Sequence, residues 1–455
     1  MPDSWTLAQA RALWWHKQAL AGTATGSLAG VIGGSGWLRT LGGTDVYLAA
    51  RARRPGMPRA ALDAAVTAGE LRVHPAVRGC IYLVPSAVVP DLLALNAETW
   101  RAQTEKDLAK IGKSLQVVEA MAPALLAALT APMTTDQIRK ALRGDIPSLG
   151  LSFGDAGKKV GLSSPLPLAL RLLELAGTIE RSLDGGRLDT DRYLWRKTAG
   201  KLGAPAKDHA GRIARLVDAF LGFAGPATLA QLSAWSGRPQ RELKPALAAY
   251  DAVPVTVETL GEAYLHAADL RARPPAPRGI ALVAFEDNYL VNHGLAAVTD
   301  PGHHALEADI WGDARPEALG TADHVLSRTI VIDGLIAGFW EVDPRTEGAV
   351  WHTFDPAPAA LARRLDELTA TTAAFLLAEL GHAKVFTLDT MDDVQARADR
   401  IVQMKPGKRS KPGKPASKAR AKPSPKAREK PAKPRPSPAR TRTAKPARAT
   451  AKARS

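Results

Sequence analysis

Histidines are the residues of this chain whose type most directly suggests chemistry, because an imidazole can bind a metal ion or transfer a proton. The chain has 10 of them, and the densest group is His293, His303, His304 and His324. None follows the HExxH spacing or the Cys/His spacing of a zinc site. We therefore expect exposed loop histidines, no metal ion and no cofactor.

Three other groups contain residue types that occur in binding or catalytic sites. The glycine-rich runs at 33–36 and 41–44 lack the Lys-Ser/Thr of a phosphate-binding loop, which indicates helix boundaries. The run Glu286-Asp287-Asn288 could bind a cation, but it is more typical of a hydrogen-bonded turn after a strand. Cys80, the only cysteine, is expected to be a buried small residue, and a single cysteine excludes a disulfide framework and cysteine-pair zinc fingers.

Positive charge is concentrated at the C-terminal end. Residues 405–455 hold 19 lysines and arginines and one acid, whereas residues 1–404 hold 42 basic and 44 acidic side chains. With ten prolines and no aromatic or large aliphatic residue, this tail cannot bury enough apolar surface to fold, so we predict that it is disordered. A mobile polycation favours non-specific binding to a polyanion and does not distinguish DNA from RNA.

The sequence contains no sign of a membrane segment or a secretory signal. No apolar run approaches the roughly 18–20 residues that cross a bilayer. The N-terminus lacks the basic region with which a secretory signal begins. We expect a cytoplasmic protein without membrane contact.

The elements that would position any site follow one pattern three times: helices, then two strands joined by a turn. In the middle copy, LPLALRLLELAG predicts a helix that begins near Pro165 and ends at Gly177, and Asp184-Gly185-Gly186 predicts a turn between strands. A second copy covers residues 210–266. A looser copy near the N-terminus contains the predicted helices TDVYLAARARR and PRAALDAAVTAG. This is the layout of a winged helix, a helix-turn-helix variant.

After residue 276 the segments become β-rich and predict a small antiparallel barrel. The predicted fold class is therefore α+β, with tandem winged-helix (helix-turn-helix) units, a small C-terminal β-barrel and a disordered basic tail. The predicted boundaries are 1–118, 119–205 and 206–275 for the three units, 276–404 for the barrel with its terminal helix, and 405–455 for the tail.

This order of units resembles the tandem winged-helix DNA glycosylases, a bacterial family that repairs alkylated and crosslinked bases. The resemblance covers roughly residues 5–400, and its best local matches are GPATLAQLSAWSG, LVAFEDNYLV and VIDGLIAGFW. It implies duplex DNA, including damaged DNA, as the partner.

The catalytic signature of that family is missing here. The signature is a Gln-apolar-Gln or Gln-apolar-Asp motif before a helix that ends in Arg. The matching region reads GWLRTLGGTDVYLAARAR, and no glutamine occurs between Gln18 and Gln103. Such a pair would position a water against the sugar of an extruded nucleotide, which Gly and Thr cannot do in the same way. Asp45 is the acid that remains nearby. It could position a water, or it could simply cap the following helix.

In a winged helix, the helix before the hairpin enters the major groove and the wing contacts the backbone. Residues at such positions are the predicted DNA contacts: Arg51, Arg53, Arg54, Arg59, Lys158, Lys159, Ser163, Ser164, Arg187, Arg238, Gln240, Arg241 and Lys244. A solvated helix face is the alternative interpretation for each of them. Trp37 and Tyr47 could stack on an unpaired base or belong to the core.

Two functions remain open. The first is a non-catalytic DNA-binding protein, associated with the nucleoid of a bacterial cell, that retains the glycosylase scaffold without its chemistry. The second is a DNA glycosylase with altered catalytic residues, in which Asp45 replaces the missing signature. An RNA- or ribosome-associated factor is a weaker third interpretation. The lesion or sequence recognised and the oligomeric state are left open by the sequence.

Overall fold

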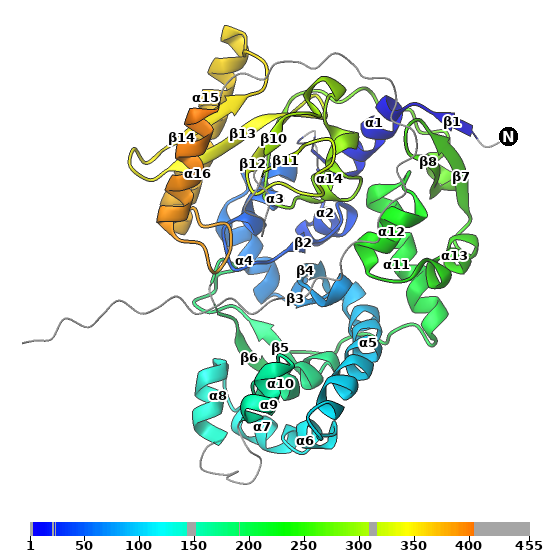
Figure 1. Ribbon diagram of the computed structural model, residues 1–455, viewed down its shortest axis with the longest axis vertical. Helices are drawn as coiled ribbons and strands as arrows, with labels where there is room; N and C mark the ends of the chain where they lie inside the picture. Colours follow the sequence, from blue (N-terminus) through cyan, green and yellow to red (C-terminus); the bar gives the residue numbers. More distant parts are fainter. Residues whose placement is uncertain are drawn as a thin grey trace, which may run out of the picture. The chain divides into compact units, whose positions relative to one another are not determined.

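The computed structural model describes residues 3–20, 22, 24–142, 152–190, 192–308 and 316–404. The tail at 405–455 lies outside the described residues. The described residues form helix-rich segments that end in strands, followed by a four-stranded sheet (Figure 1).

The N-terminal segment combines helices with a three-stranded sheet. Its elements are β1 (Asp3–Trp5), α1 (Leu7–Lys17), α2 (Leu28–Gly34), β2 (Leu38–Arg39), α3 (Asp45–Arg53), α4 (Arg59–Thr67), β3 (Leu71–Pro75), β4 (Ile81–Pro85) and α5 (Val89–Ala109). The sheet is antiparallel in the order β2, β4, β3. The helices predicted from TDVYLAARARR and PRAALDAAVTAG are α3 and α4.

The middle segment is mostly helical. Its elements are α6 (Gln116–Glu119), α7 (Ala122–Ala128), α8 (Thr135–Leu142), α9 (Gly154–Lys159), α10 (Pro165–Leu175), β5 (Ile179–Ser182) and β6 (Leu194–Lys197). Pro165 is the first residue of α10, where a missing N–H leaves no intrahelical bond unmade. Between the antiparallel β5 and β6, a bridge joins Asp184 to Arg187 around the predicted turn.

The third segment has three helices and one hairpin. Its elements are α11 (His209–Ala224), α12 (Leu229–Ser236), α13 (Gln240–Ala249), β7 (Ala252–Val257) and β8 (Gly261–His266). Thr228 and Gln231 form a capping box, which explains why α12 begins at Leu229. Strand β1 pairs in parallel with β7, so the start of the chain joins this hairpin.

The C-terminal segment contains the largest sheet. Its elements are β9 (Ile280–Val283), α14 (Asn288–Val291), β10 (Glu307–Ala308), β11 (Glu317–Ala318), β12 (Arg328–Ile332), β13 (Leu335–Asp343), β14 (Gly348–Thr353), α15 (Ala359–Phe375), a π-helical turn (Leu376–Leu380) and α16 (Met391–Gln403). Figure 1 shows α15 and α16 beside β14, and both helices contact that strand.

The prediction of a β-barrel is wrong. Among the described residues, β14, β13, β12 and β9 form an open antiparallel sheet in that order. Phe339 of β13 packs into a core with Trp14 and Trp15 of α1, whereas its neighbour Trp340 packs into another core with Leu365 of α15. Both faces of the sheet are therefore buried against separate cores, and the strands have no single interior face around which to close.

Two further cores lie in the helical segments. One joins α5 to α11, α12 and α13, and the other joins α6, α7, α8 and α10. No helix in the described ranges is long and apolar enough to span a lipid bilayer.

Candidate nucleic-acid interface

The segment that corresponds to the missing signature connects β2 to α3. It lies against residues 383–389, the stretch between the π-helical turn and α16, which we call the C-terminal strap. The backbone N–H of Thr387 donates to the carbonyl of Leu41 at 2.8 Å, and the N–H of Thr44 donates to the carbonyl of Lys384 at 2.8 Å. The two segments are therefore joined backbone to backbone.

Two glycines make this contact possible. Gly42 has a φ of +78°, which residues with a Cβ rarely adopt, and a Cβ there would lie 2.1 Å from Oγ1 of Thr387. A Cβ on Gly43 would lie 2.2 Å from the carbonyl carbon of Val385. Since the second obstruction is backbone rather than a movable side chain, position 43 excludes any larger residue in this packing.

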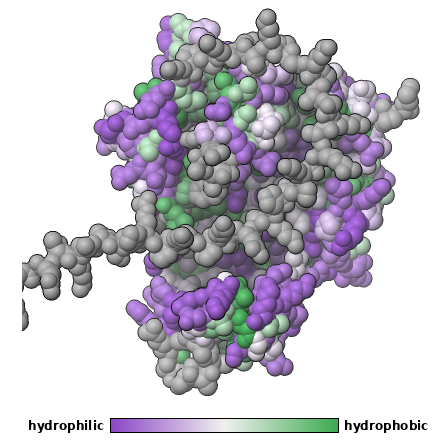
Figure 2. Space-filling model, viewed as in Figure 1, coloured by the Kyte–Doolittle hydropathy of each residue, from purple (hydrophilic) through white to green (hydrophobic). Residues whose placement is uncertain are grey.

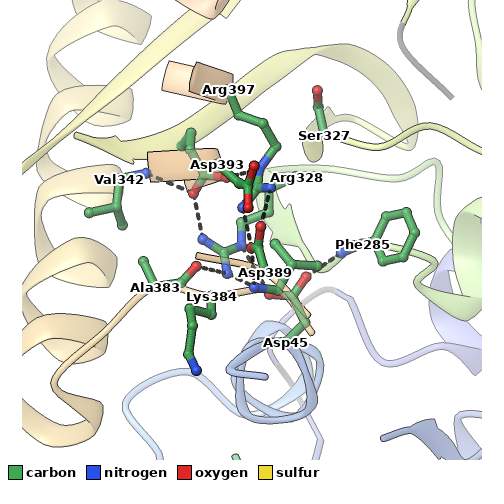
Figure 3. Close-up of polar contacts among 12 residues, drawn as sticks. Asp45, Phe285, Ser327, Arg328, Val342, Ala383, Lys384, Asp389, Asp393 and Arg397 are labelled. Atoms are coloured by element: carbon green, nitrogen blue, oxygen red, sulfur yellow. Dashed lines mark hydrogen bonds and ion pairs between the residues drawn. The ribbon is translucent and has the colours of Figure 1, made fainter. Parts of the chain in front are cut away.

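Asp45 begins α3 and is almost completely buried, with 7% of its surface exposed. Its Oδ1 accepts hydrogen bonds from Nε and Nη2 of Arg328 at 3.0 and 2.6 Å, and its Oδ2 accepts one from the backbone N–H of Phe285 at 2.6 Å (Figure 3). Burial raises the pKa of the Asp45 carboxyl, while the Arg328 charge and these hydrogen bonds lower it. Both carboxylate oxygens are engaged within the protein.

The Asp45–Arg328 pair continues into a buried network of alternating charges. Arg328 also donates to Glu341 at 2.5 Å, and Arg397 of α16 donates to Glu341 at 2.8 Å and to both oxygens of Asp389 in the strap. Burial lowers the pKa of Arg328, but Asp45 and Glu341 more than offset this, so the pKa lies above its ordinary value. The network ties α3, the sheet, the strap and α16 together (Figure 3).

The cavity next to Asp45 is too small for a nucleobase. Its volume is about 20 Å³, and its lining includes Trp37, Arg39 and Asp45. One water molecule needs about 10–15 Å³ by this measure. Arg39 forms an ion pair with Glu286, and Asn288 donates to the carbonyls of Ser35 and Trp37, so polar side chains of the cavity wall are engaged within the protein.

A larger pocket is also lined by this segment. Its volume is about 520 Å³, and Thr40, Leu41 and Gly42 form part of its wall. Three arginines line it, Arg139 of α8, Arg181 of β5 and Arg192 before β6, against one acid, Asp136. We call this pocket the arginine groove. Arg181 pairs with the buried Glu174, and Arg139 and Arg192 both pair with Asp136. One positive charge remains in excess among these side chains, which suits a phosphate-bearing ligand.

Aromatic side chains form another part of the groove wall. Tyr193 and Trp195 line the groove, and the guanidinium of Arg181 lies 4.5 Å from the Trp195 ring centroid. The Trp195 indole donates to Oγ1 of Thr135 at 3.1 Å. These contacts fix the Trp195 ring and hold Arg181 against it.

The four arginines predicted from the N-terminal copy have different surroundings. Arg53 is completely buried and donates to both oxygens of Asp287 and to Gln18, so its guanidinium cannot reach a phosphate at the surface. Arg59 pairs with Asp63, and Arg51 lies 4.0 Å over the Phe375 ring. Arg54 is exposed and donates to the carbonyl of Gly26. We do not retain Arg53 as a candidate DNA contact.

In the middle segment, Lys158 and Lys159 are exposed on α9, and Lys158 pairs with Asp155. Ser163 is exposed, whereas Ser164 is buried at the N-terminus of α10. Arg187 donates to both oxygens of Asp189. Of the cations in this set, both lysines are exposed, and Arg187 is held by Asp189.

In the third segment, Gln240, Arg241 and Lys244 are exposed on the first turns of α13. Arg238 is mostly buried and donates to the carbonyl of Leu95 at 2.6 Å. The structure therefore brings Gln240, Arg241 and Lys244 together on one helix face and directs Arg238 inward.

Several other candidates belong to the core. Tyr47 is buried and donates to Asp63 at 2.5 Å, and Trp37 packs against Trp235. The prediction of exposed histidines is wrong for His293 and His303, which are buried. His293 stacks on Trp14 with ring centroids 3.6 Å apart. Within the described ranges, no group of three or more His, Cys, Asp or Glu side chains is arranged to hold a metal ion.

The residues that sequence reasoning missed are the groove arginines Arg139, Arg181 and Arg192. The spacing in the predicted hairpin contained a signal, because Arg181 and Trp195 are cross-strand partners in β5 and β6. The groove arginines lie beside Thr40–Gly42 only because segments far apart in the chain pack together. Local sequence patterns do not predict such packing.

The fold and the groove define a class of protein: α+β, with helix-rich segments that end in antiparallel strands around a cationic pocket. The chain belongs to the AlkZ-like DNA glycosylase family, whose model matches residues 40–376. In its fold it is similar to the DNA glycosylase AlkZ of Streptomyces sahachiroi, with 20% sequence identity and a TM-score of 0.62, over 85% of this chain and 99% of that one. No curated protein matched the chain.

Proposed function

We propose that this protein is a winged-helix DNA-binding protein on a DNA-repair glycosylase scaffold and that it lacks the usual glycosylase chemistry of its family. The observation that carries the proposal is the contact between Gly43 and the strap. The region where the family signature would stand leaves no room for a glutamine side chain. Gly43 itself has no side chain that could hold a water against a sugar.

The proposed partner is duplex DNA, including damaged duplexes. Exposed cations on α13 and α9 and the arginine groove supply the positive charge that a phosphate backbone requires. The helix–helix–helix–hairpin order of the third segment supports a winged helix in which α13 enters the major groove. Figure 2 shows mostly hydrophilic residues over the visible surface of the described part. Because DNA is the proposed partner, we propose that the protein is associated with the nucleoid in the bacterial cytoplasm.

The second candidate function is a DNA glycosylase with altered catalytic residues. Membership of a glycosylase family and the buried Asp45, whose pKa is raised by burial as in many general acids, favour it. Against it stand the three hydrogen bonds that occupy both Asp45 oxygens and the cavity of about 20 Å³ beside them.

The test is a combined binding and base-release assay on the full chain. Duplexes that contain a methylated purine or an interstrand crosslink are incubated with the protein, and abasic sites and bound complex are measured separately. We expect binding without base release. Release that disappears in Asp45→Asn, with the variant still folded, would establish the second candidate instead.

A further inference from the structure

Leu388 is the most exposed large hydrophobic side chain among the described residues. It is 79% exposed, and in the same ranges the only other large hydrophobic residue that is mostly exposed is Val402, at 64%. A single exposed leucine is common on protein surfaces, so its position decides whether it has a role. Val402 lies near the end of α16, whereas Leu388 lies on the strap.

Leu388 lies at the tip of a tight turn. The N–H of Asp389 donates to the carbonyl of Phe386 at 3.0 Å, which places Thr387 and Leu388 at the two central positions of a β-turn. Turn tips usually carry glycine, proline or short polar residues. The conformation of the turn therefore does not explain why residue 388 is a leucine.

The turn is fixed on both sides of Leu388. Thr387 donates through its N–H and its hydroxyl to the carbonyl of Leu41. Asp389 accepts hydrogen bonds from two guanidinium nitrogens of Arg397 at 2.9 and 2.7 Å and from the N–H of Val385 at 2.8 Å. Leu388 is therefore held out into solvent by a rigid support rather than by a loose loop.

The same turn borders the arginine groove. Thr387 is part of the groove wall together with Thr40, Leu41 and Gly42. Two groove arginines reach solvent, since the side chains of Arg139 and Arg192 are 36% and 69% exposed. Leu388 therefore directly follows a residue of the groove wall, in a groove whose two solvent-exposed arginines share Asp136 as their single acidic partner.

We propose that Leu388 is a wedge that inserts between base pairs of duplex DNA bound at the arginine groove. The inference rests on the proposed function, because it names what that interface does to its partner. Leucine is one of the side chains that proteins insert between base steps to unstack and bend a duplex. One projecting apolar residue beside arginines fits a base step, whereas a protein partner would need a broader apolar patch. The strap lies outside the residues matched by the family model.

The experiment uses the full chain and short duplexes in which 2-aminopurine replaces each adenine in turn, because its fluorescence rises when it is unstacked. We expect at least one position to brighten on binding by the wild type. In Leu388→Ala we expect that increase to fall about fivefold or more, with the dissociation constant raised less than about tenfold. Leu388→Phe retains the increase, because a phenyl ring can fill the same step. Val402→Ala is the matched control and behaves like the wild type.

The outcomes separate the two proposals. If the wild type binds no duplex, the proposed function fails. If it binds but no position brightens, or if Leu388→Ala brightens every position as the wild type does, the wedge is overturned and the DNA-binding function stands. Circular dichroism of Leu388→Ala checks that this exposed substitution leaves the fold unchanged.

Discussion

Asp45 stabilises the fold through its buried ion pair and hydrogen bonds, and its replacement should lower the stability of the protein. Asp45→Asn removes one partner of a buried pair in which Arg328 is fully covered. Breaking such pairs costs about 3–5 kcal/mol, and because Glu341 still pairs with Arg328 we expect a loss of about 3 kcal/mol. Urea denaturation measures it. The matched control is Asp155→Asn, whose partner Lys158 is also exposed, and it should change stability by less than about 0.5 kcal/mol.

The packing of Gly43 gives a second prediction at this scale. Gly43→Ala places a Cβ against the strap backbone, and overpacking of this kind costs about 1–3 kcal/mol. Gly34→Ala, at the end of α2, meets nothing within 4 Å and should be neutral or slightly stabilising. Thermal or urea unfolding of both variants compares them. Equal stabilities would show that the strap can move away from position 43.

Buried histidines make the fold sensitive to acid. Burial lowers the pKa of both His74 and His293 to about 3 from 6.5, helped by nearby cations. Below pH 6.5 the unfolded chain therefore binds more protons than the folded one, and the stability present at neutral pH is lost as pH falls. Each group contributes about 1.4 kcal/mol per pH unit in this window.

Denaturation between pH 7.5 and about 5 measures this slope in the wild type and in His74→Leu. The variant should lose roughly half of the slope. A slope that His74→Leu leaves unchanged would contradict the assignment of a neutral imidazole in the folded protein.

Among the helices, α13 is the one that we expect to enter the major groove of DNA. The double substitution of Arg241 and Lys244 by alanine removes two exposed cations from its first turns. We expect weaker binding to all duplexes alike and a salt slope reduced by about 2, as expected for two lost phosphate contacts. Fluorescence anisotropy at several salt concentrations measures the slope. Arg101→Ala on α5, 52% exposed, is the control and should leave it unchanged.

Elements were predictable where local signals decide and not where distant segments meet. Pro165 at the first position of α10 and the turn between β5 and β6 depend on residues close in sequence. The open sheet was not predictable in this way, because its shape depends on α1 packing on one face and α15 on the other. For the same reason the sequence predicted that a helix begins near Asp45, but it did not predict the ion pair of Asp45 with Arg328, 283 residues away.

At the scale of the whole molecule, the tail and the body have to be separated by experiment. Residues 1–404 have a net charge near zero, so any DNA contacts there must come from local cations such as those of the groove and α13. The tail supplies a further 19 cations. Each neutralised phosphate contributes about −0.9 to the slope of log affinity against log salt.

If half of the tail cations contact phosphates, deletion of residues 405–455 should reduce that slope by about 8 or 9, while the difference between wild type and Arg241/Lys244 variants persists in the shortened chain. The slope is measured on duplex and on single-stranded RNA of equal length. A slope unchanged by the deletion would show that the tail does not contribute to DNA binding. On single-stranded RNA we expect a smaller loss, of about 6 or 7, because each neutralised phosphate of a single strand contributes only about −0.7. Any preference for duplex DNA beyond this difference must then reside in the folded body.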